Sequence, residues 1–295
     1  IVVLSEDPDG LTGINQAKYA KGMQARYQKL RPYIDARENR EQWCIAAVPG
    51  VKWAKKVFPE LPKGRAVEKL WEVILSCSRA LEGDPEENWR LHNLELKARA
   101  DRLNAMGLVS LEYRSANGTD LKVGLIPEAL FLGGAERCPV NGVLYDPNIP
   151  SEELFITPKA GSAEGIVHAT MPLVFQGILI EDFWLRFEGG KVTELHAEKN
   201  EEALRTLVSM DEGAAMLGEC ALVPYASPIR ESGILFYNTL FDENAACHLA
   251  LGRGYSSNIR DYENYSLEEL RAMGVNDSMV HEDFMIGSED LSITG

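Results

Sequence analysis

A change of pattern at Gly107 constrains the fold of this chain more than any other feature of its sequence. Before Gly107, apolar residues recur at helical spacing in long segments. After it, short runs rich in β-branched and aromatic residues dominate. The first two runs, residues 108–115 and 119–126, flank the turn sequence Ala-Asn-Gly and predict a hairpin. A helix-rich part is therefore expected to precede a strand-rich part.

The first part reads as alternating helix and strand. Three helical segments are expected at residues 14–30, 64–81 and 84–106. The first should stop before Pro32, and the third should begin with Asp84 as its cap and end at Gly107. The apolar run 43–49, bounded by a proline, predicts a buried strand. This alternation is typical of an α/β domain.

In the second part, strand patterns extend to the C-terminus. Runs at 165–175, 178–188 and 191–198 predict strands, and one helix is expected near 200–210. The sequence thus predicts an α/β protein with two α/β-type domains: residues 1–106, the remainder of an N-terminal α/β domain, and residues 107–295, a β-rich α+β catalytic domain. Because the chain opens on an apolar run without Met and closes on a strand-like run, both ends are expected to continue in a longer protein.

Charge and cysteine content exclude several classes of partner. A formal net charge of −15 disfavours nucleic acid and anionic membrane surfaces, because both would repel it. No apolar run approaches the roughly 18–20 residues that span a bilayer, and no signal-peptide pattern is present. The five cysteines are odd in number and scattered, which favours reduced thiols. We therefore expect a cytoplasmic protein.

The chain has no GxSxG, HExxH, Walker A or GxGxxG motif. The side chains that remain as candidates for chemistry lie in the last 150 residues. They are acidic, imidazole and phenol side chains in unusual local contexts: Glu152 and Glu153 between two prolines, Glu219 at the head of an apolar strand, Asp242, Glu243, His248 and Tyr255 in a Gly-punctuated apolar stretch, and His281 with Asp283.

His281 and Asp283 are the most informative of these from spacing alone. In a strand, residues i and i+2 point to the same face, so both side chains could reach one ion. A buried carboxylate needs a charge partner or a metal. By itself, however, such a pair is more commonly a packed histidine beside a solvated aspartate.

Four segments of the chain resemble the signature segments of the thermophilic aminopeptidase family, which includes aminopeptidase T, aminopeptidase S and PepS. They are NIPSEELF, GECALVPYASPI, FYNTLFDENAACHLALG and HEDFMIGS, in this order. The third is long and chemically unusual, which makes it specific. Residues 42–59 and 118–125 also match the family, so the resemblance covers essentially the whole chain.

The resemblance implies a metal-dependent aminopeptidase, a hydrolase that removes the N-terminal residue from short peptides with a free N-terminus. It also implies a homodimer. By resemblance the metal ligands are Glu153, Glu219, His248, His281 and Asp283, with Glu243 as a further metal-contacting or catalytic carboxylate.

The same resemblance assigns catalytic roles to three residues. Glu219 and Glu243 are the candidates for general base, and Tyr255 is the expected donor to the developing oxyanion. Five or six ligands, mostly carboxylates, suit two divalent ions with a bridging carboxylate. Zinc is the first choice, with cobalt, manganese or magnesium as competitors. If the segment around Glu152 and Glu153 is extended, only one of these two carboxylates faces the site.

Three other functions stay open on the sequence. A cysteine-dependent peptidase could use Cys247 or Cys220, although Cys247 is adjacent to His248 and neighbours diverge in regular structure. A non-catalytic metal- or peptide-binding protein would lack the base or the tyrosine, yet Glu243 and Tyr255 are both present. The third is an α/β protein with a merely acidic surface.

Overall fold

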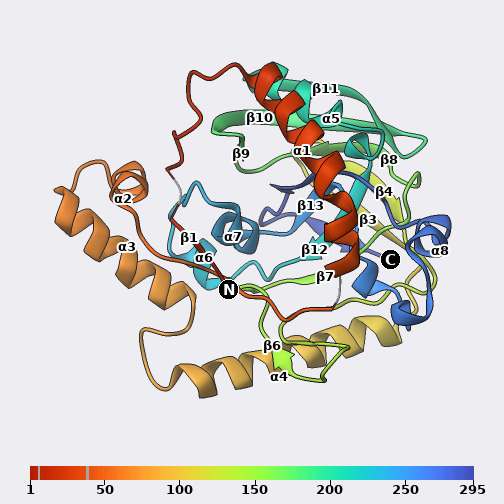
Figure 1. Cartoon of the computed structure of the whole chain (residues 1–295), viewed down its shortest axis with the longest axis horizontal. Coiled ribbons are helices and arrows are strands. Elements are labelled where there is room, and N and C mark those ends of the chain that lie inside the picture. Colours follow the sequence, from red (N-terminus) through yellow and green to blue (C-terminus); the bar gives the residue numbers. More distant parts are fainter. Residues whose placement is uncertain (6, 38–39) are drawn as a thin grey trace.

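Two antiparallel sheets that share one core form the framework of the chain (Figure 1). The computed structural model describes residues 1–5, 7–37 and 40–295. The larger sheet has seven strands. In spatial order they are β11 (Lys191–Lys199), β10 (Ile178–Glu188), β8 (Glu164–His168), β4 (Asp120–Gly124), β3 (Ser110–Arg114) and β15 (Ser292–Thr294), with β9 (Leu173–Phe175) paired to β10.

The smaller sheet has four strands and carries most of the candidate site. Its order is β14 (His281–Met285), β13 (His248–Gly252), β12 (Leu217–Leu222) and β7 (Leu154–Ile156). One face of this sheet contributes Cys220, Leu249 and Phe284 to the core shared with the larger sheet. The rings of Phe183 and Phe284 connect the two layers, with centroids 5.9 Å apart. This apolar contact fixes which face of the smaller sheet is left for chemistry.

Two further strand pairs are short. β1 (Val2–Leu4) pairs in parallel with β2 (Ile45–Ala47), and β5 (Glu136–Arg137) pairs with β6 (Leu144–Tyr145). The helices are α1 (Gln16–Arg37), α2 (Val51–Val57), α3 (Lys63–Cys77), α4 (Pro85–Ala105), α5 (Glu201–Val208), α6 (Pro228–Glu231), α7 (Thr239–Asp242) and α8 (Leu267–Met273). None of the helices in the described ranges is both long and apolar enough to cross a membrane.

A second core joins the N-terminal helices to a late segment of the chain. Trp53 and Leu70, from α2 and α3, pack with Phe236 and Phe241. The indole N–H of Trp53 donates to the carbonyl of Phe236 at 2.6 Å. Burying two aromatic side chains against these helices stabilises an otherwise irregular segment. The segment that carries Glu243 is therefore held by residues from the first quarter of the chain.

Several expectations from the sequence are confirmed. Asp84 caps α4, accepting from the amide of Glu86 at 3.0 Å, and the helix ends just before Gly107. The hairpin around Ala-Asn-Gly is present, with Arg114 opposite Asp120. The chain is a mixed α/β structure, and the change from helix to strand falls between α4 and β3. Its division into two domains at this point stays a prediction.

Two expectations are wrong. α1 does not stop before Pro32, which lies inside the helix. A proline there removes one backbone hydrogen bond, but Arg31 and Asp35, on either side of it, form an ion pair at 3.3 Å and Arg31 also reaches Asp277 at 2.6 Å. These contacts hold both halves of the helix in place.

The second error concerns the last third of the chain, where one helix near 200–210 was expected among strands. α5 is that helix, but α6, α7 and α8 follow it, with 3₁₀ turns between strands. Each begins at a capping side chain: Ser227, Asn238 and Ser266 accept from backbone amides of their first turns. Such caps favour short helices in a sequence whose apolar pattern alone predicts strand.

Candidate metal centre

The register of the smaller sheet brings four of the predicted site residues to one face. Glu219 on β12 lies opposite Ala250 on β13, and Ala250 lies opposite Asp283 on β14. Residues opposite each other in a sheet point to the same side. His248 is two residues before Ala250, and His281 is two residues before Asp283, so they share that side. The alternate residues of these strands face the core, so the sheet has one polar face and one apolar face.

Seven side chains predicted from the sequence line one pocket here. Two overlapping clusters of possible metal ligands form its floor, Glu153–Glu219–His248 and Glu219–His281–Asp283, and within each the ligand atoms lie within 4.8 Å of one another. Glu219 belongs to both. Its Oε1 is 3.8 Å from Nε2 of His248, and its Oε2 is 3.2 Å from Nε2 of His281. One carboxylate therefore spans two adjacent sites.

Backbone carbonyls orient both imidazoles. Nδ1 of His248 lies 3.1 Å from the carbonyl of Ala246, and Nδ1 of His281 lies 2.7 Å from that of Arg253. A carbonyl only accepts, so each Nδ1 carries a proton and each Nε2 is directed at the carboxylates. A ring held through its other nitrogen is the usual arrangement of a metal-ligating histidine.

The carboxylates of these clusters are buried without enough protein partners. Glu153, Glu219 and Asp283 are all buried. Among the described residues, Oε2 of Glu153 and Oδ1 of Asp283 have no hydrogen-bond partner, although each lies near an imidazole Nε2, at 3.0 and 3.4 Å. Leaving buried anionic oxygens unpaired is costly. This donor set of carboxylates and imidazoles fits divalent cations.

The protonation behaviour of the site reflects the crowding of like charges. Burial, followed by the charges of Glu219 and Asp283, raises the pKa of Glu153. Burial lowers the pKa of His248, but its contacts with Glu153 and Glu219 outweigh this and raise the pKa well above its usual range. Both shifts reflect in part the negative charge gathered at this floor, which a divalent cation bound there would offset.

Glu243 and Tyr255 stand beside the clusters. Glu243 is buried in the 3₁₀ turn Glu243–Ala245 that follows α7, and burial and the charge of Asp283 raise its pKa well above the usual range. It lines the same pocket but belongs to neither cluster of the described residues. The hydroxyl of Tyr255 lies 3.2 Å from Nε2 of His281. Both side chains line the pocket beside the clusters.

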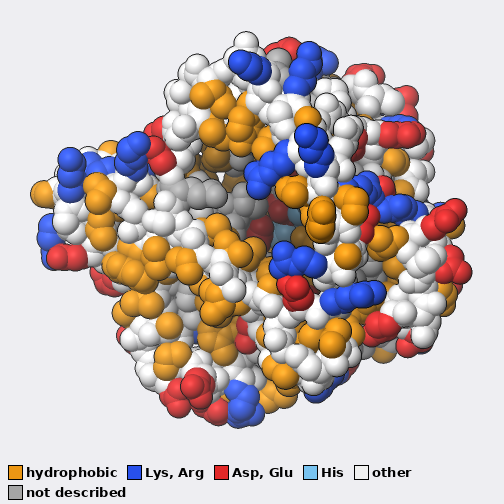
Figure 2. Space-filling view, in the orientation of Figure 1, with side chains coloured by type: hydrophobic (Ala, Val, Ile, Leu, Met, Phe, Trp, Pro, Cys, Tyr) orange, Lys and Arg blue, Asp and Glu red, His pale blue; other side chains and the backbone are white. Residues whose placement is uncertain are grey.

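The pocket above these residues has a volume of about 610 Å³. Figure 2 shows it as a hollow in this face, with acidic and histidine side chains at its floor. Its walls include the apolar side chains Ile34, Trp43, Ile45, Phe155 and Leu240. A charged floor within an apolar wall is the common form of a small-molecule or peptide site.

Glu152 does not join the clusters. It is buried on the other side of the segment, with Arg79 at 2.6 Å and Nε2 of His92 at 3.8 Å from its Oε1. Sequence reasoning did not single out Arg79, His92 or Asn244. Asn244 directly follows Glu243 and could have been noticed for that reason, but Arg79, just after α3, and His92, in α4, lie in segments with no signal of chemistry.

Neither Cys220 nor Cys247 has an activated thiol. All five cysteines are free. Cys220 faces the core, and burial raises its pKa to about 12. Burial also raises the pKa of Cys247, whose thiol donates to the carbonyl of Val223 at 3.3 Å. A nucleophilic cysteine requires a lowered pKa, so these contacts argue against a cysteine peptidase.

Comparisons with known proteins place the chain among metallopeptidases. Residues 1–295 match the protein family described as "Thermophilic metalloprotease (M29)". Aminopeptidase T of Thermus aquaticus is 42% identical over 296 residues, which cover 100% of this chain and 72% of that protein. Aminopeptidase AmpS of Bacillus subtilis (strain 168) is 41% identical over 296 residues, with the same coverage of 100% and 72%. The solved structure "Wild-type AmpT from Thermus thermophilus" matches with a TM-score of 0.86 at 40% identity, covering 99% of this chain and 70% of that one.

Proposed function

The chain belongs to the thermophilic metalloprotease (M29) family, and from this premise we propose that its pocket holds two divalent metal ions and hydrolyses the first peptide bond of short peptides. The enzyme is a metallo-aminopeptidase, like the aminopeptidases it resembles. The observation that carries the two-ion proposal is the position of Glu219 between two histidine–carboxylate clusters.

The residues that would hold the ions are Glu153, Glu219 and His248 for one, and Glu219, His281 and Asp283 for the other. Bound there, such ions supply Lewis acidity and lower the pKa of a water molecule towards neutrality. Zinc fits the imidazoles and carboxylates best, and cobalt, manganese or magnesium are competitors because the site is rich in oxygen.

In this proposal, a carboxylate of the chain takes the proton of the attacking water and delivers it to the leaving amine. We assign this role to Glu243, because Glu219 is already shared between the clusters. Although Tyr255 as a whole is 39% exposed, desolvation at the pocket floor raises its pKa, as do the nearby carboxylates, so its phenol keeps its proton at neutral pH. Its hydroxyl can then donate to the oxyanion that develops on the scissile carbonyl.

The proposal also covers the substrates, the location, the oligomeric state and the domains of the enzyme. The substrates are short peptides with a free N-terminus, and the protein acts in the cytoplasm as a homodimer. Residues 1–106 form an N-terminal α/β domain and residues 107–295 the catalytic domain. The change from α4 to β3 near residue 107 supports the last point. Gel filtration with light scattering tests the dimer, and a monomer at micromolar concentration would contradict it.

The decisive experiment is a panel of chromogenic aminoacyl substrates, assayed with the purified protein before and after chelation. We expect hydrolysis that chelation abolishes and that zinc, cobalt, manganese or magnesium restores to different extents. An N-acetylated substrate is the matched control and should not be cleaved. Tight binding of metal without hydrolysis of any substrate would leave a non-catalytic metal-binding protein instead.

A further inference from the structure

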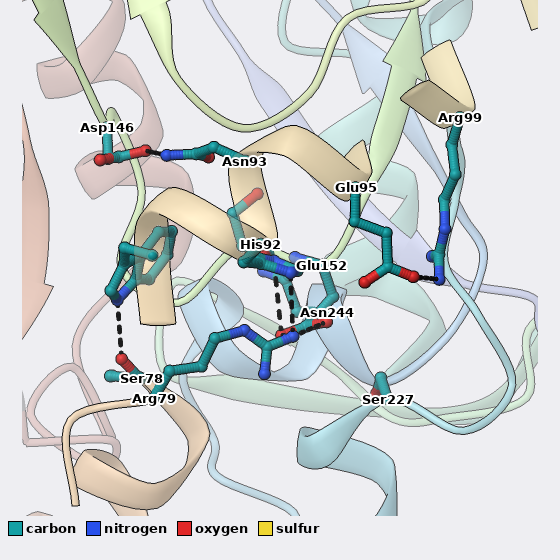
Figure 3. Close-up of polar contacts among 12 residues, drawn as sticks. Ser78, Arg79, His92, Asn93, Glu95, Arg99, Asp146, Glu152, Ser227 and Asn244 are labelled. Atoms are coloured by element: carbon teal, nitrogen blue, oxygen red, sulfur yellow. Dashed lines mark hydrogen bonds and ion pairs between the residues drawn. The ribbon is translucent and has the colours of Figure 1, made fainter. Parts of the chain in front are cut away.

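A polar network behind the metal centre connects the two segments that carry Glu153 and Glu243 (Figure 3). It consists of Arg79, His92, Glu152 and Asn244, none of which lies in the clusters described above. Its members come from the end of α3, from α4, from the loop before β7 and from the turn after α7. The network is therefore one of the places where helices of the first part of the chain contact the site.

Arg79 and His92 hold the residues that precede Glu153. One terminal nitrogen of Arg79 lies 2.6 Å from Oε1 and 2.7 Å from Oε2 of Glu152. The same nitrogen is 3.1 Å from Nδ1 of His92. A guanidinium only donates, so Nδ1 of His92 accepts and its Nε2 carries the proton. That Nε2 donates to the carbonyl of Ser151 at 2.7 Å.

Arg79 is itself fixed in place. It follows α3 with φ of 56°, a left-handed conformation that a non-glycine residue adopts only when its surroundings hold it. Its carbonyl accepts from the side chain of Asn88 at 3.0 Å. A rigid arginine at this point gives Glu152 one defined position, and Glu153 is the next residue.

Asn244 links the segment of Glu152 to the segment that carries Glu243. Its side chain is fully buried. Its Oδ1 accepts from the backbone N–H of Glu152 at 2.6 Å, while its Nδ2 donates to the carbonyl of Leu240 at 3.0 Å and to Oε1 of Glu243 at 3.4 Å. Only this orientation of the amide satisfies one donor and two acceptors. A single side chain thus sets the spacing between the neighbour of Glu153 and the carboxylate of Glu243.

We propose that Asn244 is a positioning residue that, with the Arg79–Glu152 contact behind it, sets where the carboxylate of Glu243 stands relative to Glu153. The inference rests on the proposed function, since it gives both carboxylates a role at the metal centre. Groups that orient ligands in this way typically change activity or metal affinity about 10–100-fold when removed.

The test compares Asn244→Ala with Asn238→Ala. Asn238 lies in the same segment and caps α7 through its Oδ1, which accepts from Leu240 N–H at 3.2 Å. Removing that cap should lower the melting temperature without removing a contact of Glu243. Asn244→Ala should lower kcat about 10–100-fold with KM changed less than about threefold. Asn238→Ala should keep both constants within about threefold while its melting temperature falls.

Zinc affinity of the metal-free protein, measured by equilibrium dialysis, gives a readout that does not need turnover. Asn244→Ala should bind zinc about 10–100-fold more weakly than the wild type, and Asn238→Ala should not. If the wild type hydrolyses no peptide, the proposed function fails and zinc affinity alone decides this inference. Asn244→Ser, which leaves room for a water molecule, serves if the alanine variant does not fold. Wild-type kcat and zinc affinity in a folded variant, or failure of both variants to fold, would overturn the positioning role.

Discussion

The hydroxyl of Tyr255 lies 3.2 Å from Nε2 of His281, so one phenol stands at the edge of the second ligand cluster. The two rings are tilted, with centroids 4.7 Å apart. The backbone N–H of Tyr255 donates to Oγ1 of Thr157 at 2.8 Å, and the ring packs edge-on against Phe155 at 5.6 Å. These contacts fix the ring independently of the hydroxyl, so the role of the hydroxyl can be tested separately.

Tyr255→Phe should lower kcat about 10²–10³-fold while KM and metal content stay nearly unchanged, as expected for the loss of one oxyanion donor. The ring contacts remain, so the melting temperature should not fall. Steady-state kinetics and metal analysis of the purified variant provide the check. Tyr225→Phe, at an exposed tyrosine outside the pocket, is the matched control. Full activity of Tyr255→Phe would remove this assignment and leave the metal site standing.

Glu243→Gln should abolish measurable turnover, because glutamine cannot take a proton from the attacking water; removing a general base typically costs about 10²–10⁴-fold. Zinc affinity separates the two roles left open for this residue. A pure base leaves zinc binding close to that of the wild type, whereas a ligand loses zinc as well. Glu231→Gln, at an exposed position on α6, controls for the change of charge. Turnover within about tenfold of the wild type would show that another carboxylate is the base.

Much of the ligand geometry could be anticipated because it is local. The spacing of His281 and Asp283 on one strand face depends only on strand periodicity, and so does the alternation that separates Glu219 from Cys220. Their strands were also recognisable by their apolar neighbours. The requirement that only one of Glu152 and Glu153 face the pocket follows from the same rule, and it is Glu153 that does.

What could not be anticipated depends on contacts between distant segments. Arg79 meets Glu152 across 73 positions of sequence, and no local pattern marks that pair. The turn that holds Glu243 is kept in place because Phe241 is buried against Trp53, a residue of the distant helix α2. The same limitation explains α1, which continues through Pro32 because of its contacts with Asp277 and not because of its own pattern.

His92 should make the stability of the protein depend on pH in a defined window. Burial lowers its pKa from 6.5 to about 4. The folded state therefore binds its proton less tightly than the unfolded state, so this contribution is present above pH 6.5 and is lost as pH falls towards 4. Relative to His92→Gln, which does not titrate, the wild type should lose up to about 2 kcal/mol of unfolding free energy between pH 7 and pH 5. Denaturant unfolding at the two pH values measures this, and parallel changes in both proteins would contradict it.

Thiol alkylation should leave the activity of the enzyme largely intact, whereas chelation should abolish it. The thiols of Cys220 and Cys247 are buried or engaged, and burial raises the pKa of both. Iodoacetamide at neutral pH should therefore leave most of the activity intact under conditions in which a chelator abolishes it. Mass spectrometry identifies which cysteines react. Inactivation that follows modification of Cys247, with metal content unchanged, would favour the cysteine-dependent alternative.

Glu219 should be the one ligand whose removal weakens the binding of both ions. Its two oxygens face His248 and His281 separately, at 3.8 and 3.2 Å, whereas each histidine contacts one cluster. Glu219→Ala should therefore lose zinc from both sites, while His248→Ala and His281→Ala should each keep one tight ion. Zinc titration of the metal-free variants by equilibrium dialysis gives the stoichiometry directly. His196→Ala, at a histidine outside the pocket, should bind zinc like the wild type. If Glu219→Ala retains one tight ion, the carboxylate does not bridge and the two clusters act as independent sites.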